Sequence, residues 1–567
     1  MIRGHRGRRV GTTAVLALGL ALIAAACGAG GASHSAPATT STRAPDPPAA
    51  EAPPTTTFPS FSIAMDEGID YLDPGLSYTT EGWGVMWDVY LPLIGYRHVN
   101  GPDGAMLVPY LAQSLPRVSS DGRTYTLTLR KGLKYSNGLT VKASDFARTI
   151  ERAYQLDSVG ASFFDDIVGA REYGQAKKGR IGGIVTDDAT GRIAIHLVSP
   201  EGDFENVLAS LYAAPVPPDT PFKDQSTTPI PSTGPYVIKS YQPNKRIIEV
   251  RNPHFKASLF RGNVPAGNPD NVIWDLLGSD GVALQRVLDG RDDWMSYHPI
   301  PTQRLAWIRK RFESRLRIFT PANIYYFFMN TRVPPFDNLK VRQAVNYAID
   351  RNALVAIAGG LARPTENILP PTYPQYSRHV LYRHDLAKAK RLIKESGDEG
   401  MTVTVWNHDL GTDPKFTDYL TNVLNEIGLD ATQRIVNSNV YWTTIGNRAT
   451  KAQIGFADWF QDYPHPLDWF DTLLNGERIA KTYNSNYAYY DNKRVNAEID
   501  ALGRKPTLTP GVNTRWASLD RTIMEAAPWA PFLNREQTDF FSARVDMRCY
   551  ENNVVYEFDY ATICVKP

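Results

Sequence analysis

The sequence predicts a mixed α/β protein (α+β or α/β) whose body is divided into two or three lobes. The chain has 567 residues, and beyond about 250–300 residues a protein normally splits into more than one hydrophobic core. Patterns with a period of two, typical of strands, alternate with 3.6-residue patterns typical of helices. Because no internal repeat accompanies this alternation, we expect the chain to pass between its lobes more than once.

The first clear strand and helix lie in the N-terminal half of the body. In residues 124–129, threonines alternate with Tyr125, Leu127 and Leu129, a pattern that buries one face of a strand. Asp-Gly and Asn-Gly pairs on either side predict turns. Residues 143–154 then place apolar residues on one face and an acid in the first turn, which predicts a helix.

Further elements follow in the C-terminal half. Residues 337–360 predict one amphipathic helix that begins after the cap candidates Asp337 and Asn338 and ends at a glycine pair. Residues 401–407 predict a strand, and residues 416–428 predict another helix.

The N-terminus predicts export. A basic head precedes an apolar run at residues 15–26, which is too short for a membrane span of about 20 residues but suits a secretory signal. The sequence AAACG at residues 24–28 resembles the lipobox of bacterial lipoproteins, whose cysteine is acylated. We therefore expect a signal peptide at residues 1–26 and lipidation of Cys27. Alanine at position 24 departs from the leucine that is usual at this position of a lipobox. The alternative to a lipoprotein signal is an ordinary cleaved signal peptide followed by an incidental cysteine.

Residues 27–58 consist mainly of Ala, Pro, Ser, Thr and Gly. Such a segment buries too little apolar surface to offset its ordering entropy, so it predicts a disordered tether. We expect ordered structure to begin at residues 58–63.

The two remaining cysteines, Cys549 and Cys564, lie close together near the C-terminus. In an exported protein such a pair predicts a disulfide, which would contribute about 3 kcal/mol by closing a small loop. The ten histidines are scattered and show no metal-binding spacing, so no metal site is predicted. A net charge of +2 with no dense basic run outside the signal head argues against nucleic-acid binding.

Residues 456–471, FADWFQDYPHPLDWFD, combine six aromatic residues and four aspartates without a lysine or arginine. One interpretation is a surface loop of no special role. The other is a cavity floor where a carboxylate pairs with a cation that the protein does not supply, because a buried carboxylate without a partner is costly.

Four segments, in order along the chain, resemble segments of one protein family. Residues 71–82 resemble the family's cleft segment, and residues 111–153 resemble its signature strand–turn–helix. Residues 232–255 resemble a strand pair that opens with G-T-G-P-Y, with serine in place of the first glycine. Residues 325–355 resemble the strand and helix that open the second large lobe. The family is the solute-binding proteins of peptide ABC importers, family 5.

The resemblance implies a two-lobed periplasmic-binding-protein-like fold, type II and cluster C-like, with an extra small lobe. The expected ranges are 59–91, 215–315 and 515–567 for lobe I, 92–214 for the small lobe, and 316–514 for lobe II.

The resemblance also implies a ligand site. Asp462 follows a tryptophan by three positions and matches the aspartate that receives the ligand's α-ammonium group. Asp458 and Phe460 would offer main-chain groups to an extended peptide, and Tyr78 and Thr80 would contribute from the facing lobe. The aromatic residues Trp459 and Tyr463 complete the expected ligand-binding set.

Alternatives remain for individual residues of this stretch. Asp458 can instead pair with an arginine, and Trp459 can be a cleft wall or a core residue. Asp468 and Asp471 are expected to be caps or solvated acids of the following helix. Phe456 stands where some oligopeptide binders have an arginine that binds the ligand carboxylate. The ligand's C-terminus must therefore be bound by another group, which the sequence does not identify, or by none.

Together these features predict a lipid-anchored substrate-binding protein on the extracytoplasmic face of the cell membrane. It would be a monomer that captures peptides in an interlobe cleft and delivers them to a membrane ABC permease. We expect no cofactor and no enzymatic activity, because no nucleophile–base arrangement or phosphate loop is present. The alternative is an envelope lipoprotein that binds a non-peptide ligand or acts as a regulator or scaffold.

Overall fold

The structure is a computed structural model that describes residues 59–566 except 67 and 412. The expected signal peptide, the acylated Cys27 and the tether lie outside the described residues. Within the described part of the chain, every helix is too short or too polar to span a bilayer.

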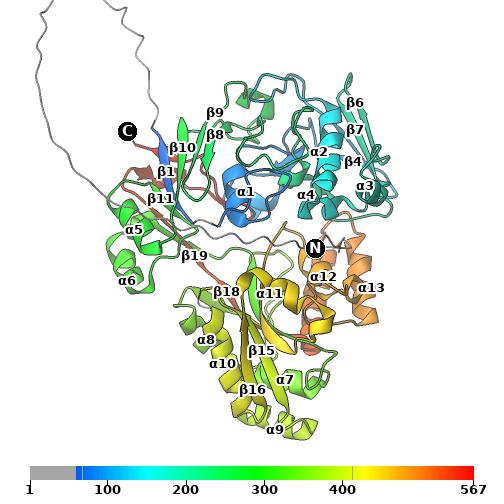
Figure 1. Ribbon diagram of the computed structural model, residues 1–567, viewed down its shortest axis with the longest axis vertical. Helices are drawn as coiled ribbons and strands as arrows, with labels where there is room; N and C mark the ends of the chain where they lie inside the picture. The colour runs from blue at the N-terminus through cyan, green and yellow to red at the C-terminus, as the bar shows by residue number, and fades with distance from the viewer. Residues whose placement is uncertain (1–58, 67, 412, 567) are drawn as a thin grey trace, which may run out of the picture. The chain divides into compact units, whose positions relative to one another are not determined.

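Lobe I is built on a seven-stranded sheet in the order β12-β19-β11-β1-β10-β9-β8 (Figure 1). The chain enters it through β1 (Phe61–Met65), which runs parallel to both of its neighbours. The other strands are β8 (Tyr236–Gln242), β9 (Arg246–Arg251), β10 (Asn271–Leu276), β11 (Trp294–Ser296), β12 (Leu316–Phe319) and β19 (Gln537–Phe541). Its helices are α1 (Thr80–Met86), α5 (Asp280–Leu288) and α6 (Thr302–Arg311).

The small lobe contains a four-stranded sheet in the order β4-β5-β7-β6. The expected strand is present as β5 (Thr124–Thr128), with Tyr125 and Leu127 buried, and the expected helix is α2 (Ala143–Gln155). The remaining elements are β4 (Arg117–Val118), β6 (Ile184–Asp187), β7 (Arg192–His196), α3 (Ala170–Ala176), α4 (Phe204–Leu208) and the nearby pair β2 (Ile94–Tyr96) and β3 (Leu107–Pro109).

Lobe II is built on a six-stranded sheet in the order β14-β18-β13-β17-β15-β16. Its strands are β13 (Asn323–Met329), β14 (Ala362–Pro364), β15 (Thr402–His408), β16 (Asp430–Val436), β17 (Ile454–Phe460) and β18 (Trp529–Arg535). All residues of β13 are buried because helices cover both faces of the sheet. One face packs on α7 (Leu339–Ala348), α9 (Leu386–Ser396) and α10 (Asp413–Glu426), and the other on α12 (Leu467–Leu474), α13 (Lys493–Gly503) and α14 (Pro510–Glu525).

The predicted helix over residues 337–360 is two helices. It begins after Asn338 as expected, but α7 ends at Ala348 and α8 (Arg351–Ile357) starts after a new cap, Asp350. The Asp350 side chain accepts the N–H of Asn352. An aspartate that caps in this way competes with the helical backbone, which explains the break.

Two of the expected lobe boundaries differ from the boundaries that strand pairing gives. Strand β12 pairs with β19 in the sheet of lobe I, so lobe II starts after it, at residues 320–322. At the other end, α14 and β18 pack in lobe II, so the return to lobe I is at Glu536. Both boundaries depend on strand partners that are far apart in the sequence and carry no local signal.

The C-terminal segment closes on lobe I. Cys549 and Cys564 form a disulfide with 5.6 Å between their Cα atoms. Two short strand pairs lie in the same segment, β20 (Val545–Asp546) with β23 (Cys564–Val565) and β21 (Asn552–Asn553) with β22 (Glu557–Phe558).

Asn323 joins the two connections between the lobes. Its side-chain amide donates to the carbonyls of Pro321 (3.0 Å) and Arg535 (2.9 Å) and accepts the N–H of Arg535 (2.8 Å). Asn323 is fully buried, so its loss would leave these main-chain groups without partners.

We expect Asn323→Ala to destabilise the protein by about 2–4 kcal/mol, because several buried hydrogen bonds are lost together. Urea unfolding followed by tryptophan fluorescence measures this change. The control is Asn422→Ala, on the exposed face of α10, which should change the stability by less than about 0.5 kcal/mol. An equally small change for Asn323→Ala would contradict the assigned role.

Candidate functional site

Strand β17 has an open edge over its C-terminal half. It pairs with β13 along its whole length, from Ile454 to Phe460. On the other side it pairs with β15 only at Ile454 and Gly455. The edge that faces β15 is therefore unpaired beyond Gly455.

The main-chain groups of Asp458 and Phe460 point toward this open edge. On that side, the carbonyl of Phe456 accepts a hydrogen bond from the Tyr441 hydroxyl (2.6 Å). On the β13 side, Gln461 donates its N–H to the carbonyl of Ala322 (3.1 Å). Since main-chain groups alternate between the two edges of a strand, residues 458 and 460 point the same way as Phe456. Among the described residues, no hydrogen bond reaches them from the open side.

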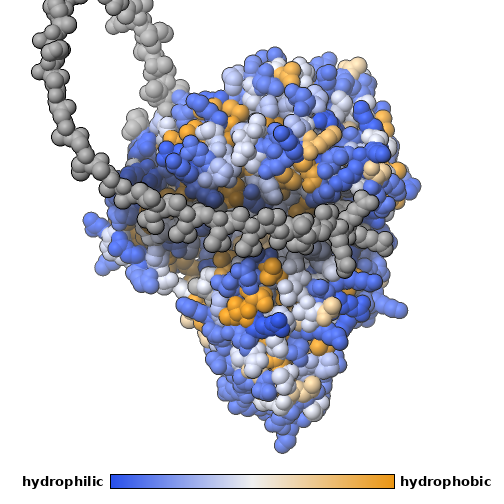
Figure 2. Space-filling view, in the orientation of Figure 1, coloured by the Kyte–Doolittle hydropathy of each residue, from blue (hydrophilic) through white to orange (hydrophobic). Residues whose placement is uncertain are grey.

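A cavity of about 410 Å³ lies along this edge. Residues 458–462 form one wall, Trp442 and Tyr487 of lobe II form another, and Tyr78 and Val159 approach from the facing side. Trp442 belongs to α11 (Ser438–Ile445), and Figure 2 shows apolar side chains gathered around this helix. The cavity therefore combines apolar walls with an unpaired strand edge.

Asp462 lies in this cavity and has no cationic partner among the described residues. Its two carboxylate oxygens each lie 3.0 Å from the hydroxyl of Tyr78, which donates from the facing lobe. Its own N–H donates to the carboxylate of Asp468 (3.0 Å). Burial raises the pKa of Asp462 to about 6, and the Tyr78 hydroxyl opposes this rise.

Asp468 is a site residue, and its expected role as a cap or solvated acid was wrong. It is 1% exposed and accepts hydrogen bonds from the N–H of Asp462 and the indole of Trp459 (3.4 Å). Burial, and then the charge of Asp462, raise the pKa of Asp468. The fold turns the first turn of α12 back onto the end of β17, and no local sequence signal shows this. Asp471 pairs with Arg478 (2.8 Å) at the surface.

Asp458 forms a second acidic position in the cavity. Burial, followed by the Asp413 carboxylate, raises the pKa of Asp458 to about 7, and the Arg535 guanidinium lowers it. Asp413 in turn lies 3.5 Å from His408. Sequence reasoning missed Arg535 and Asp413, which lie at the ends of other elements of lobe II.

The other predicted residues divide into two groups. Trp459 and Phe460 line the cavity, so Trp459 serves as a cleft wall. Tyr463 and Thr80 are not among the residues that line the cavity. The Tyr463 hydroxyl donates to Asp203 (2.7 Å), and the carbonyl of Thr80 accepts from Tyr297 (3.2 Å).

Phe456 is a core residue. It is fully buried and stacks parallel to Phe416, with 6.2 Å between the ring centroids. The position where some oligopeptide binders have an arginine therefore contributes to the core of lobe II instead of the cavity.

Comparison with known sequences matches this chain to one protein family. The profile of the bacterial extracellular solute-binding proteins, family 5 Middle, matches residues 106–481. The glutathione-binding protein GsiB of Salmonella typhi is 27% identical over 450 residues, which cover 77% of this chain and 83% of that protein. GsiB of Escherichia coli K12 is 26% identical over 451 residues, with the same coverage.

Comparison with solved structures gives the same fold. The clavulanic acid biosynthesis oligopeptide binding protein 2 superposes with a TM-score of 0.83 at 24% identity, covering 91% of this chain and 97% of that chain. The periplasmic binding protein DppA from Helicobacter pylori, in complex with the peptide STSA, gives 0.71 at 20% identity, covering 90% and 99%. These likenesses show the two-lobed periplasmic-binding-protein fold.

The raised pKa values of Asp458 and Asp462 predict a pH dependence of stability. The folded protein keeps these acids protonated at a pH where the unfolded chain has already ionised them, so their stabilising contribution is lost as the pH rises from about 4 to 7. We expect the melting temperature to fall over this range, and to fall less steeply in the double variant Asp458→Asn, Asp462→Asn. Thermal unfolding at several pH values measures both slopes.

The control for this experiment is Asp430→Asn, which removes an exposed acid of β16. It should leave the pH dependence of the melting temperature as it is in the wild type. Identical slopes for the double variant and the wild type would show that these acids ionise normally.

Proposed function

Because the chain belongs to the bacterial extracellular solute-binding proteins of family 5, we propose that it captures short peptides in the cavity along β17 and delivers them to a membrane ABC permease. Members of this family are extracytoplasmic binding proteins of ABC importers and are not enzymes. The single observation that carries the peptide assignment is Asp462, an acid in the cavity without a cationic partner among the described residues.

The amino end of the ligand would pair with Asp462. A partly buried carboxylate is costly unless it is protonated or paired, and its raised pKa expresses this cost. A peptide α-ammonium group would form charge-assisted hydrogen bonds with both carboxylate oxygens. Glutathione, named for the GsiB relatives, is itself a tripeptide with a free ammonium group.

The backbone of the ligand would pair with the open edge of β17. The main-chain groups of Asp458 and Phe460 are placed to hydrogen-bond an extended peptide that adds to the sheet as a further strand. Such pairing gives affinity without recognising side chains. Trp442, Trp459 and Tyr487 provide apolar contact area for the ligand side chains.

The carboxyl end of the ligand would approach Arg535. Asp458 lies four residues before Asp462. Because β17 ends at Phe460 and the chain bends at Asp462, the two residues are at most about 13 Å apart, which corresponds to up to roughly four peptide residues. Arg535 is half-buried and acts electrostatically on Asp458. Arg535 is not among the residues that line the cavity, so its guanidinium would act on the ligand carboxylate from behind Asp458, in place of the arginine that Phe456 replaces.

We expect Asp462→Asn to weaken the binding of free-amino peptides by at least tenfold and to leave the binding of N-acetylated peptides nearly unchanged. The reason is that only the ammonium group needs the carboxylate. Isothermal titration calorimetry with matched tri- and tetrapeptides measures both affinities.

The matched control is Asp471→Asn, which removes a neighbouring acid that is paired with Arg478 outside the cavity. It should bind both peptide classes like the wild type. If Asp462→Asn weakened the binding of free and acetylated peptides equally, the assigned role of Asp462 would be wrong.

We also propose that the protein is a monomer that is lipid-anchored through Cys27. Cys27 lies outside the described residues, so this proposal rests on the signal-like residues 1–26 and the lipobox-like AAACG sequence. The polar tether at residues 27–58 would separate the anchor from the folded body.

The anchor predicts that the full-length protein partitions into the membrane fraction, and that its N-terminal peptide carries a diacylglyceryl group on Cys27. Cys27→Ser should move the protein into the soluble fraction. Cell fractionation and mass spectrometry of the N-terminal peptide measure both effects. An unmodified cysteine in membrane-extracted protein would rule out acylation as the anchor.

A further inference from the structure

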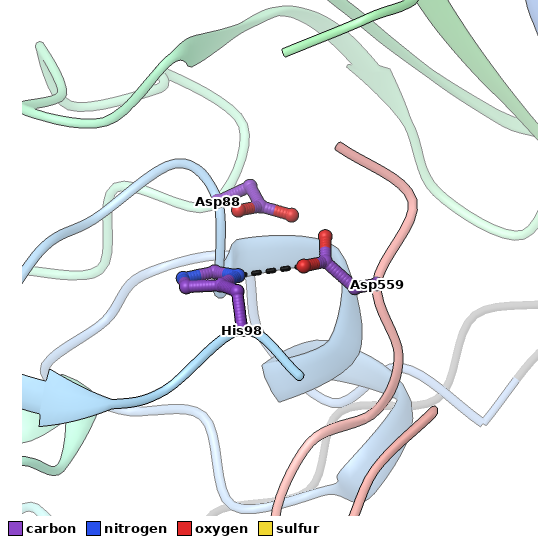
Figure 3. Close-up of side chains that lie close together, drawn as sticks. All are labelled: Asp88, His98 and Asp559. Carbon is purple, nitrogen blue, oxygen red and sulfur yellow. Dashed lines mark hydrogen bonds and ion pairs between the residues drawn. The ribbon is translucent and has the colours of Figure 1, made fainter. Parts of the chain in front are cut away.

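Lobe I contains a cluster of two carboxylates and one imidazole away from the peptide cavity. Asp88 follows α1, His98 follows β2, and Asp559 lies in the C-terminal segment between β22 and β23. One potential ligand atom from each residue lies within 4.8 Å of the others. Figure 3 shows the three side chains pointing toward one another from three separate segments.

The cluster is sealed from solvent. Asp88 and Asp559 are fully buried, and the side chain of His98 is 5% exposed. Trp87 stacks on the imidazole with 4.4 Å between the ring centroids. In the described part of the chain, no lysine or arginine forms an ion pair with either carboxylate.

Neither carboxylate oxygen of Asp88 makes a hydrogen bond of good geometry among the described residues. The nearest polar groups are the Asp559 carboxylate and the N–H of Ala561. A buried carboxylate in this state is costly, and structures normally satisfy such groups. Each carboxylate oxygen of the nearest acid, Asp559, already has a partner. One accepts from the N–H of Ala561 (3.0 Å), and the other lies 2.6 Å from Nδ1 of His98.

The hydrogen bonds around His98 determine which ring nitrogen carries the proton. The Tyr110 hydroxyl donates its single proton to the carbonyl of Tyr96 (2.5 Å). Toward His98 the same hydroxyl oxygen therefore acts as the acceptor, and Nε2–H of His98 donates to it (2.9 Å). Nε2 therefore carries hydrogen. In the neutral ring the lone pair is on Nδ1, and it points toward Asp559. A partner that fixes the second nitrogen in this way is typical of metal-ligating histidines.

We propose that Asp88, His98 and Asp559 bind a divalent transition-metal ion, with Zn²⁺ as the first candidate. Two carboxylates and a neutral imidazole carry a charge of −2, which the ion neutralises. A proton on Nδ1 would leave a charge of −1, and a further proton shared between the Asp88 and Asp559 carboxyl groups is the metal-free arrangement that competes with the ion. Metal binding uses the lone pair of Nδ1 and satisfies Asp88 at the same time.

The donor set selects the class of ion. An imidazole nitrogen with two carboxylates suits zinc and its first-row neighbours such as Mn²⁺, whereas Ca²⁺ is bound by oxygen ligands alone. At tetrahedral zinc, with zinc–ligand distances near 2.0–2.2 Å, Nδ1 and the Asp559 oxygen would lie about 3.4 Å apart, so these two atoms would have to separate from their present 2.6 Å when the ion binds.

The ion would have a structural role. It would join the C-terminal segment, which the Cys549–Cys564 disulfide also closes, to the end of α1. The start of α1 directly follows Tyr78, the residue that contacts Asp462. Because the cluster is buried, the ion would be incorporated during folding.

The test uses the untagged full-length protein from cells grown with added Zn²⁺ or Mn²⁺. We expect about one metal equivalent per chain by inductively coupled plasma mass spectrometry. We also expect a crystal to give an anomalous peak among the three side chains at the metal absorption edge. Asp88→Asn should lose the metal and melt several degrees lower than the wild type. Added Ca²⁺ should not replace the metal.

The matched control is Glu249→Gln, which removes a buried acid near Asp88 that is not one of the three ligands. It should retain the metal. The proposal is overturned if the wild type contains less than about a tenth of an equivalent under all growth conditions, or if Asp88→Asn retains wild-type metal. If Asp88→Asn does not fold, the wild-type metal content and the anomalous map decide alone.

Discussion

The charge of Asp462 is the constraint around which the cavity is organised. Its carboxylate is half-buried between aromatic walls, and among the described residues the one group that donates to it is the neutral hydroxyl of Tyr78, at 3.0 Å. The neighbouring Asp468 adds a second negative charge and holds the main chain of Asp462 in place. An incoming ammonium group therefore meets a preformed acceptor that no lysine or arginine of the described chain neutralises.

The second feature of the cavity is the divergence of β15 from β17. The two strands pair only at Ile454 and Gly455 and then separate. This leaves the main chain of Asp458 and Phe460 available to a ligand while β13 holds the other edge of β17 rigid. The connections at residues 320–322 and Glu536 lie at the Phe460 end of β17, because Asn323 pairs with Phe460 and its side chain hydrogen-bonds to Pro321 and Arg535. The proposed ligand-binding edge and the link between the lobes are therefore neighbours in space.

Sequence reasoning succeeded where the signal is local. The strand at β5, the helix at α2 and the cavity position of Asp462 follow from short patterns or from a motif of a few residues. It failed where the outcome depends on packing. Asp468 is buried against the main chain of Asp462 because α12 folds back, and one expected helix is broken at Asp350 by a competing side-chain cap. Arg535 and Asp413 were missed because only the sheet brings them to Asp458.

The sequence by itself determined the mixed α/β class, the family and the position of an acid that lines the cavity, because hydrophobic periodicity and short motifs are properties of neighbouring residues. Only the tertiary structure decided which strand edge is open, where the chain crosses between the lobes and which acids lack partners. Asp88 and Asp559 show the reason: they are 471 positions apart in the numbering, and their carboxylates meet because long-range packing buries both beside one imidazole.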